Sequence, residues 1–160
     1  MLRKTQDCGT GYMPIKNVDI SKQQEINLTL IEMEKLDFMQ MNAKLISYNG
    51  WTIAKALEAE VLYKKWLALH KVYGELLEIA PNDLVDEYWH AHILDTQKYM
   101  KDCEVILGRY LHHYPYFGLT EDESQKELDE GFKLTQELFK AHFGHDIIGN
   151  NNKCKATSCR

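Results

Sequence analysis

Residues 52–73 read TIAKALEAEVLYKKWLALHKVY, and this stretch decides the fold class. Its large apolar residues recur at steps of three and four, and its lysines and glutamates fall between them. A helix turns about 100° per residue, so this spacing gathers the apolar side chains on one face. The segment therefore predicts an amphipathic helix with the core-facing residues Ile53, Leu57, Val61, Leu62, Trp66, Leu69 and Val72.

Helical spacing also precedes and follows this segment. We expect a helix from Glu25 to the Tyr48-Asn49-Gly50 stop, because Asn and Gly accept the left-handed conformation that ends helices. Another helix should begin near Asp83 and run toward Gly108, with a new N-cap available at Asp95.

The C-terminal third predicts one loop and one further helix. Residues 109–119, RYLHHYPYFGL, are rich in aromatic residues, Pro and Gly and indicate an ordered loop. Thr120 and Glu123 form a capping box for a helix that ends at Gly144. Because no strand pattern or repeat occurs, the expected fold is all-α, a compact bundle of four to five helices.

The length of 160 residues fits one domain, since a chain of this size buries roughly 70% of its unfolded surface on folding. We expect an irregular lead-in over residues 1–24, a single helical domain over 25–144 and a flexible tail over 145–160. Cys8 lies in the lead-in, and Cys154 and Cys159 lie in the tail.

Composition and charge narrow the class of protein. With 19 basic and 24 acidic residues the net charge is −5, which argues against a nucleic-acid partner because phosphate contacts need a basic surface. No apolar run is long enough for a membrane span, and the first residues lack the apolar core of a secretory signal. We therefore expect a soluble cytoplasmic protein with reduced cysteines and no nucleic-acid or membrane partner, with a protein partner left open.

Chemistry-bearing side chains concentrate between Tyr88 and Gly118, which hold four of the seven histidines and five of the nine tyrosines. On a helix Asp86 and His90 lie four residues apart on one face, a spacing that suits two ligands of one metal ion. His92 lies about 200° from His90 around the axis. A regular helix would therefore use one histidine at a site and pack the other against the core.

A second pair, His112 and His113, lies in the aromatic loop. Neutral imidazole is the commonest metal ligand, and a loop can present both rings. With Asp86 and one helical histidine, one of this pair would complete a His/carboxylate set for zinc first, or iron or copper second. The alternative is that ring stacking and hydrogen bonds make these histidines packing residues.

The cysteines give weaker indications. Cys103 lies one turn after Tyr99 and is either a small buried hydrophobe or a further ligand near the histidines. A catalytic Cys/His pair has no accompanying oxyanion-hole signature. The CKATSC spacing of Cys154 and Cys159 allows a soft-metal site or a disulfide, but it is looser than CxxC.

No phosphate-binding loop, dinucleotide fingerprint, hydrolase elbow or zinc-protease motif occurs. We assign no catalytic residue and favour a binding protein over an enzyme. Metal-assisted hydrolysis or oxidation stays open if the metal site keeps an open position beside its tyrosines. Two rivals stay open: an interaction module in which the Trp/His/Tyr residues only lock helices together, and a metal or redox protein that acts through its cysteine tail. The predicted metal ligands are Asp86, His90, His92, Cys103, His112 and His113.

One long pattern of aromatic, histidine, acidic, proline and glycine residues runs through Pro81, Asp86, Trp89, His90, His92, Leu94, Asp95, Tyr99, Asp102, Cys103, Gly108, His112, His113, Pro115 and Gly118. With this pattern, residues 50–120 resemble the core of the glycine-rich domain-containing protein family. The resemblance implies a short member that lacks the glycine-rich region of plant relatives, so plant roles are not carried over. The Cys154–Cys159 pair looks like the remnant of a Gly/Cys-rich tail.

Overall fold

The computed structural model describes residues 19–114 and 125–147, and every regular element in these ranges is a helix. This confirms the all-α expectation, although the described helices number six. Residues 1–18 of the expected lead-in, the Thr120 capping box, loop residues 115–119 and the tail from residue 148 lie outside the described residues. Residues 20–24, which the sequence also places in the irregular lead-in, belong to the first helix. The helices are α1 (Ile20–Met33), α2 (Met39–Asn49), α3 (Ile53–Tyr73), α4 (Asp83–Leu94), α5 (Thr96–Leu107) and α6 (Gln125–Phe143).

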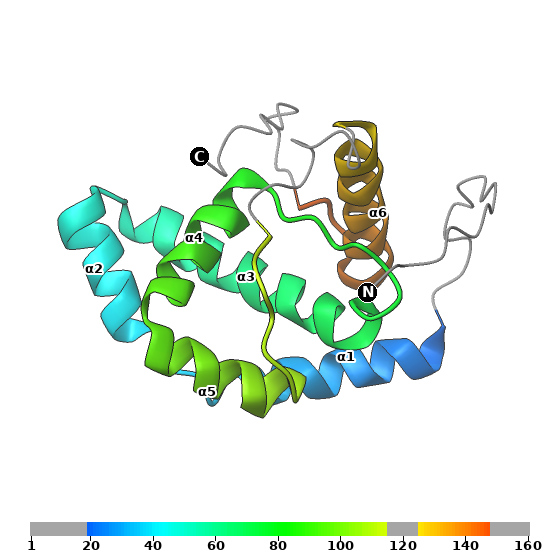
Figure 1. Ribbon diagram of the computed structural model, residues 1–160, viewed down its shortest axis with the longest axis horizontal. Coiled ribbons are helices and arrows are strands. Elements are labelled where there is room, and N and C mark those ends of the chain that lie inside the picture. Colours follow the sequence, from blue (N-terminus) through cyan, green and yellow to red (C-terminus); the bar gives the residue numbers. More distant parts are fainter. Residues whose placement is uncertain (1–18, 115–124, 148–160) are drawn as a thin grey trace, which may run out of the picture.

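The central element is α3, which contacts α1, α2, α4 and α5 (Figure 1). It begins where the Thr52 hydroxyl accepts a hydrogen bond from the Lys55 backbone amide at 3.1 Å. Because neighbours surround it on several sides, α3 supplies three of the large, fully buried side chains, Tyr63, Trp66 and Leu69.

The inward face of α3 differs from the prediction in its first half. Ile53, Leu57 and Val61 are more than half exposed, whereas Ala56 and Ala59 are fully buried. Alanine lets neighbouring backbones approach closely, so close packing favours these small residues over the bulkier ones. The other predicted core residues of this helix are buried, namely Leu62, Trp66, Leu69 and Val72.

The first predicted helix is wrong in two respects: it begins at Ile20 rather than Glu25, and it is interrupted at residues 34–38, which separate α1 from α2. The Asp37 carboxylate accepts a hydrogen bond from the Met39 amide at 2.8 Å, a local bond that competes with helix continuation. The chain also turns Phe38 inward, where only 2% of it is exposed. Edge-to-face ring contacts favour this position. The contacting rings are Tyr63, Tyr88 and His92, with centroids 6.1, 5.9 and 5.1 Å away.

The predicted helix ends are confirmed. Gly50, Gly108 and Gly144 adopt the left-handed conformation, with φ of 70°, 69° and 75°. The break between α4 and α5 falls at Asp95, whose carboxylate accepts from the Lys98 amide at 3.4 Å.

Ile147, which the sequence places in the tail, belongs to the core. Only 1% of it is exposed. Its amide donates to the Gln136 side-chain oxygen at 3.2 Å, and its carbonyl accepts from the Asn82 side chain at 3.0 Å. The segment after α6 is therefore hydrogen-bonded to the loop that precedes α4.

Candidate metal centre

Helix α4 places Asp86 and His90 one turn apart on the same face. The helix begins at Asn82, whose side chain accepts from the Val85 amide at 2.9 Å and so fixes the register of both residues. Asp86 is 5% exposed, whereas the His90 side chain is 37% exposed. The Asp86 Oδ2 and His90 Nδ1 atoms lie 3.4 Å apart.

The segment after α5 brings His113 to the same carboxylate. The Tyr99 hydroxyl donates to the Leu111 carbonyl at 2.5 Å, and Leu111 itself is buried. Trp89 donates its indole N–H to the Tyr99 oxygen at 2.8 Å, and its ring centroid lies 4.6 Å from that of His113. These contacts hold His113 Nε2 at 3.5 Å from Asp86 Oδ1.

Asp86, His90 and His113 therefore form one cluster, here called the Asp-His-His cluster. Their candidate ligand atoms all lie within 4.8 Å of one another. Two ligands of a tetrahedral zinc ion, each about 2.1 Å from the metal, lie roughly 3.4 Å apart. One carboxylate and two imidazoles also suit iron and copper, so the donor set fits a first-row transition metal.

His92 points away from this cluster, as the 100° step of a regular helix requires. It is 1% exposed, with Nδ1 3.0 Å from the Tyr63 hydroxyl and Nε2 3.0 Å from an Asp102 carboxylate oxygen. Burial lowers the pKa of His92 to about 4, although the nearby Asp102 charge opposes this. The partly exposed Lys98 ammonium, 2.6 Å from the same Asp102 oxygen, completes a polar network that runs from the core to its edge.

Cys103 and His112 also lie apart from the Asp-His-His cluster. Cys103 is buried, and burial raises the pKa of its thiol, so the side chain stays protonated near neutral pH. His112 is exposed and its ring lies against Tyr110, with centroids 4.8 Å apart. Of the six predicted ligands, the structure brings three together and places three elsewhere.

A family model matches residues 29–144, which include the whole Asp-His-His cluster and nearly three quarters of the chain. The chain belongs to the UCP032817-like family. No curated protein and no solved structure matches it. The glycine-rich name therefore stays a resemblance, carried by residues that fall inside the matched range.

No helix in the described part of this UCP032817-like chain is long and apolar enough to cross a membrane. The matched range also contains a polar network that the sequence indicates only weakly, formed by Tyr63, His92, Asp102 and Lys98. In the sequence, the only sign of this network is that Lys98 and Asp102 lie four residues, or one helical turn, apart on α5.

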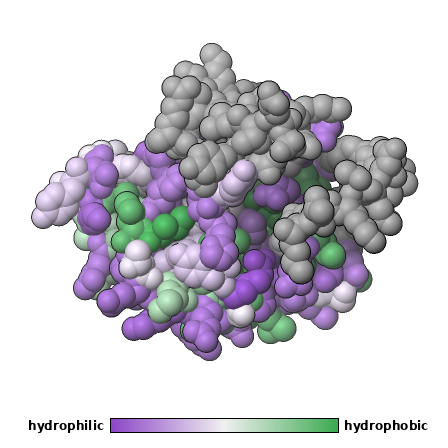
Figure 2. All heavy atoms as spheres, viewed as in Figure 1, coloured by the Kyte–Doolittle hydropathy of each residue, from purple (hydrophilic) through white to green (hydrophobic). Residues whose placement is uncertain are grey.

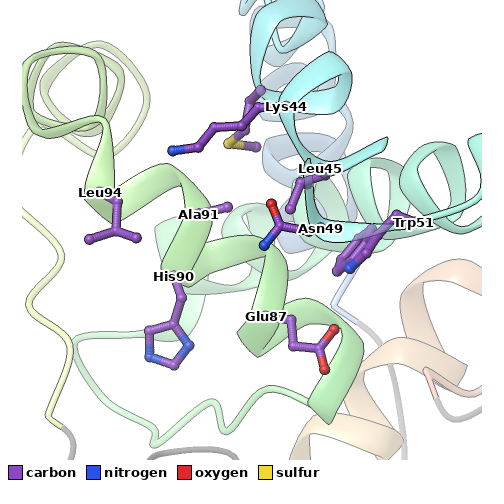
Figure 3. A pocket seen from close by; sticks show the side chains of 9 residues that line it. Lys44, Leu45, Asn49, Trp51, Glu87, His90, Ala91 and Leu94 are labelled. Carbon is purple, nitrogen blue, oxygen red and sulfur yellow. The ribbon is translucent and has the colours of Figure 1, made fainter. Parts of the chain in front are cut away.

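A groove beside the cluster also has no signature in the sequence. It lies between α2 and α4 of the UCP032817-like fold, measures about 410 Å³ and includes His90 in its lining (Figure 3). Lys44 and Asn49 extend into it from α2. Since α2 and α4 are separated in the sequence by the whole of α3, residue spacing carries no signal for this groove.

Proposed function

We propose that this protein binds one transition-metal ion through Asp86, His90 and His113, with zinc as the first choice and iron or copper as the second. The observation that supports this is the convergence of three ligand atoms, within 4.8 Å, from a helix and a distant segment. The other three predicted ligands, His92, Cys103 and His112, are not part of the proposed site.

A purely structural ion pair explains the same cluster less well. The two Asp86–imidazole separations, 3.4 and 3.5 Å, are close to the roughly 3.4 Å that separates two ligands of one tetrahedral zinc ion. The His90 and His113 rings lie 4.5 Å apart, so protonating both would place two like charges beside one carboxylate. A bound cation instead uses both imidazoles in their neutral form.

Two residues that are not proposed ligands, Trp89 and Tyr99, also support the site. Trp89 and Tyr99 fix the segment that carries His113, which is the role that groups around metal ligands commonly have. We propose a cytoplasmic, non-enzymatic binding role, and we keep kinship with glycine-rich domain proteins as part of this proposal.

Elemental analysis of tag-free protein, purified without chelators, tests the proposal. We expect one metal ion per chain for the wild type and near-zero content for His90→Gln and His113→Gln. The matched control is His112→Gln, which removes the neighbouring exposed imidazole and should keep the metal. A metal-free wild type that takes up no zinc, iron or copper, or full occupancy in His90→Gln, would overturn the proposal.

A further inference from the structure

The groove between α2 and α4 has the size of a small-molecule site. Its volume of about 410 Å³ falls in the range of roughly 300–1,000 Å³ typical of such sites. Figure 2 shows apolar side chains gathered where these helices lie side by side, flanked by hydrophilic ones. A protein partner would need a contact of about 800 Å² on each side, which a groove of this size does not supply by itself.

Both sides of the groove carry apolar side chains. Leu45 and Trp51 contribute from the α2 side, and Ala91 and Leu94 contribute from α4. Leu94 is 75% exposed, whereas Leu45 is buried, so Leu94 contributes most of the open apolar surface of these two leucines. An exposed leucine in such a setting gains free energy when an apolar ligand covers it.

The charges at the groove leave one cation uncompensated. The Glu87 carboxylate is paired with the Lys55 ammonium at 2.9 Å, and that ammonium also lies 3.8 Å from the centre of a Trp51 ring. Lys44 forms no ion pair within residues 19–114 and 125–147. Its side chain extends from α2 toward α4 (Figure 3). Among the described residues, the groove therefore presents one unpaired ammonium, Lys44, beside a carboxylate that already has a partner.

We propose that this groove binds a small organic carboxylate with an apolar body. The carboxylate pairs with the Lys44 ammonium and accepts from the Asn49 amide, and the apolar body covers Leu45 and Leu94. A charged hydrogen bond to Lys44 supplies selectivity for acids, and apolar burial supplies most of the affinity.

This inference goes beyond metal binding and does not depend on it. His90 lines the groove and also belongs to the Asp-His-His cluster, so a bound acid would lie next to a candidate metal ligand. The two sites are nevertheless tested separately, because Lys44 and Leu94 take no part in the cluster.

Octanoate is a suitable probe, and octan-1-ol is its uncharged counterpart. In an NMR titration of the full-length protein, we expect octanoate to shift the amide signals of Lys44, Asn49 and Ala91, with octan-1-ol at least tenfold weaker. Lys44→Gln should weaken octanoate binding roughly tenfold, the loss expected for one charged hydrogen bond. The matched control is Lys101→Gln, an exposed lysine on α5 that does not line the groove.

Three outcomes would overturn the inference. They are the absence of octanoate binding, equal binding of octan-1-ol, and equal octanoate affinity in Lys44→Gln and Lys101→Gln. If the protein dimerises through this face and thereby excludes octanoate, the result is the first of these outcomes, the absence of octanoate binding. Metal content measured on Lys44→Gln should match the wild type, so failure of the groove leaves the metal proposal standing. Octanoate binding to metal-free protein would stand even if the metal proposal fell.

Discussion

His90 and His92 are two residues apart, yet they occupy unlike surroundings. The His90 side chain is partly exposed beside Asp86, whereas His92 is enclosed by Tyr63 and Asp102. One histidine is therefore available to a ligand, and the other belongs to the core. The same short motif serves binding on one face of α4 and packing on the other.

Replacing His92 should reduce stability and leave metal content unchanged. His92→Phe keeps a ring of similar size but removes the partners of the buried Tyr63 hydroxyl and of Asp102. We expect the free energy of unfolding to fall by about 2 kcal/mol, the usual consequence of leaving buried polar groups unsatisfied. Urea denaturation measures the first effect and elemental analysis the second. Loss of metal with unchanged stability would instead identify His92 as a ligand.

His70 should make the protein sensitive to mild acid. Burial lowers the pKa of His70 to about 4. The hydrogen bond to the Ile79 carbonyl acts to raise this pKa, and the nearby Arg109 charge lowers it. The unfolded chain has a histidine pKa near 6.5, so between pH 6.5 and 4 it binds a proton that the folded protein does not. The contribution of neutral His70 to the free energy of unfolding is therefore fully present above pH 6.5. It is lost as the pH drops toward 4, which lowers the free energy of unfolding by about 3 kcal/mol.

Urea denaturation at pH 4.5, 5.5 and 7 tests this. His70→Gln keeps a side-chain donor for the Ile79 carbonyl but does not titrate, so its stability should fall less steeply with acid than that of the wild type. The exposed His112→Gln is the control and should retain the wild-type slope. Equal slopes in all three proteins would contradict the assignment.

Local spacing predicted part of the site and left the rest undetermined. Asp86 and His90 share a helical face because they are one turn apart, so sequence alone indicates them. The choice between His112 and His113 depends on the path after α5, which the Tyr99–Leu111 hydrogen bond fixes. That bond joins residues on different elements, and no periodic pattern carries it.

At the scale of elements, helix ends were more predictable than helix continuity. Gly50, Asp95 and Gly108 act through their own backbone or side chain, so their local sequence suffices. The interruption at Phe38 depends on rings from α3 and α4, which lie far along the chain. The exposure of the large apolar residues at the start of α3 also depends on neighbouring helices. Close packing against those helices favours buried alanine over the larger residues that recur at helical spacing.

Gly50 and Gly108 offer a matched pair of substitutions. Both have φ near 70°, and a Cβ at either position would meet no atom within 4 Å. We expect Gly50→Ala and Gly108→Ala each to lower the free energy of unfolding by about 1 kcal/mol, the cost of a left-handed alanine. Gly108 also directs the chain toward His113, so only Gly108→Ala should weaken zinc affinity. Calorimetric titration with zinc separates the two, and equal affinities would contradict a role for this turn in placing the ligand.

At the scale of the whole molecule, metal binding should stabilise the fold. The proposed ligands come from α4 and from the segment after α5, so the unfolded chain does not hold them together. Zinc at 100 times its Kd should raise the free energy of unfolding by about 2.7 kcal/mol, and the melting temperature should rise with zinc concentration. Thermal denaturation followed by circular dichroism measures this. His90→Gln should show no zinc-dependent rise, and a rise equal to the wild type would place the ion elsewhere.

The hydrogen bonds from Trp89 to Tyr99 and from Tyr99 to Leu111 have a kinetic consequence. An ion held between α4 and residues 109–114 can leave when that short segment lifts away, without global unfolding. Tyr99→Phe removes the hydroxyl that fastens the segment, so zinc transfer to a competing chelator should quicken while the initial occupancy stays complete. Tyr110→Phe removes a hydroxyl from the segment itself and should leave the transfer rate unchanged. The residence time of the metal would then be set by one tyrosine oxygen that never touches it.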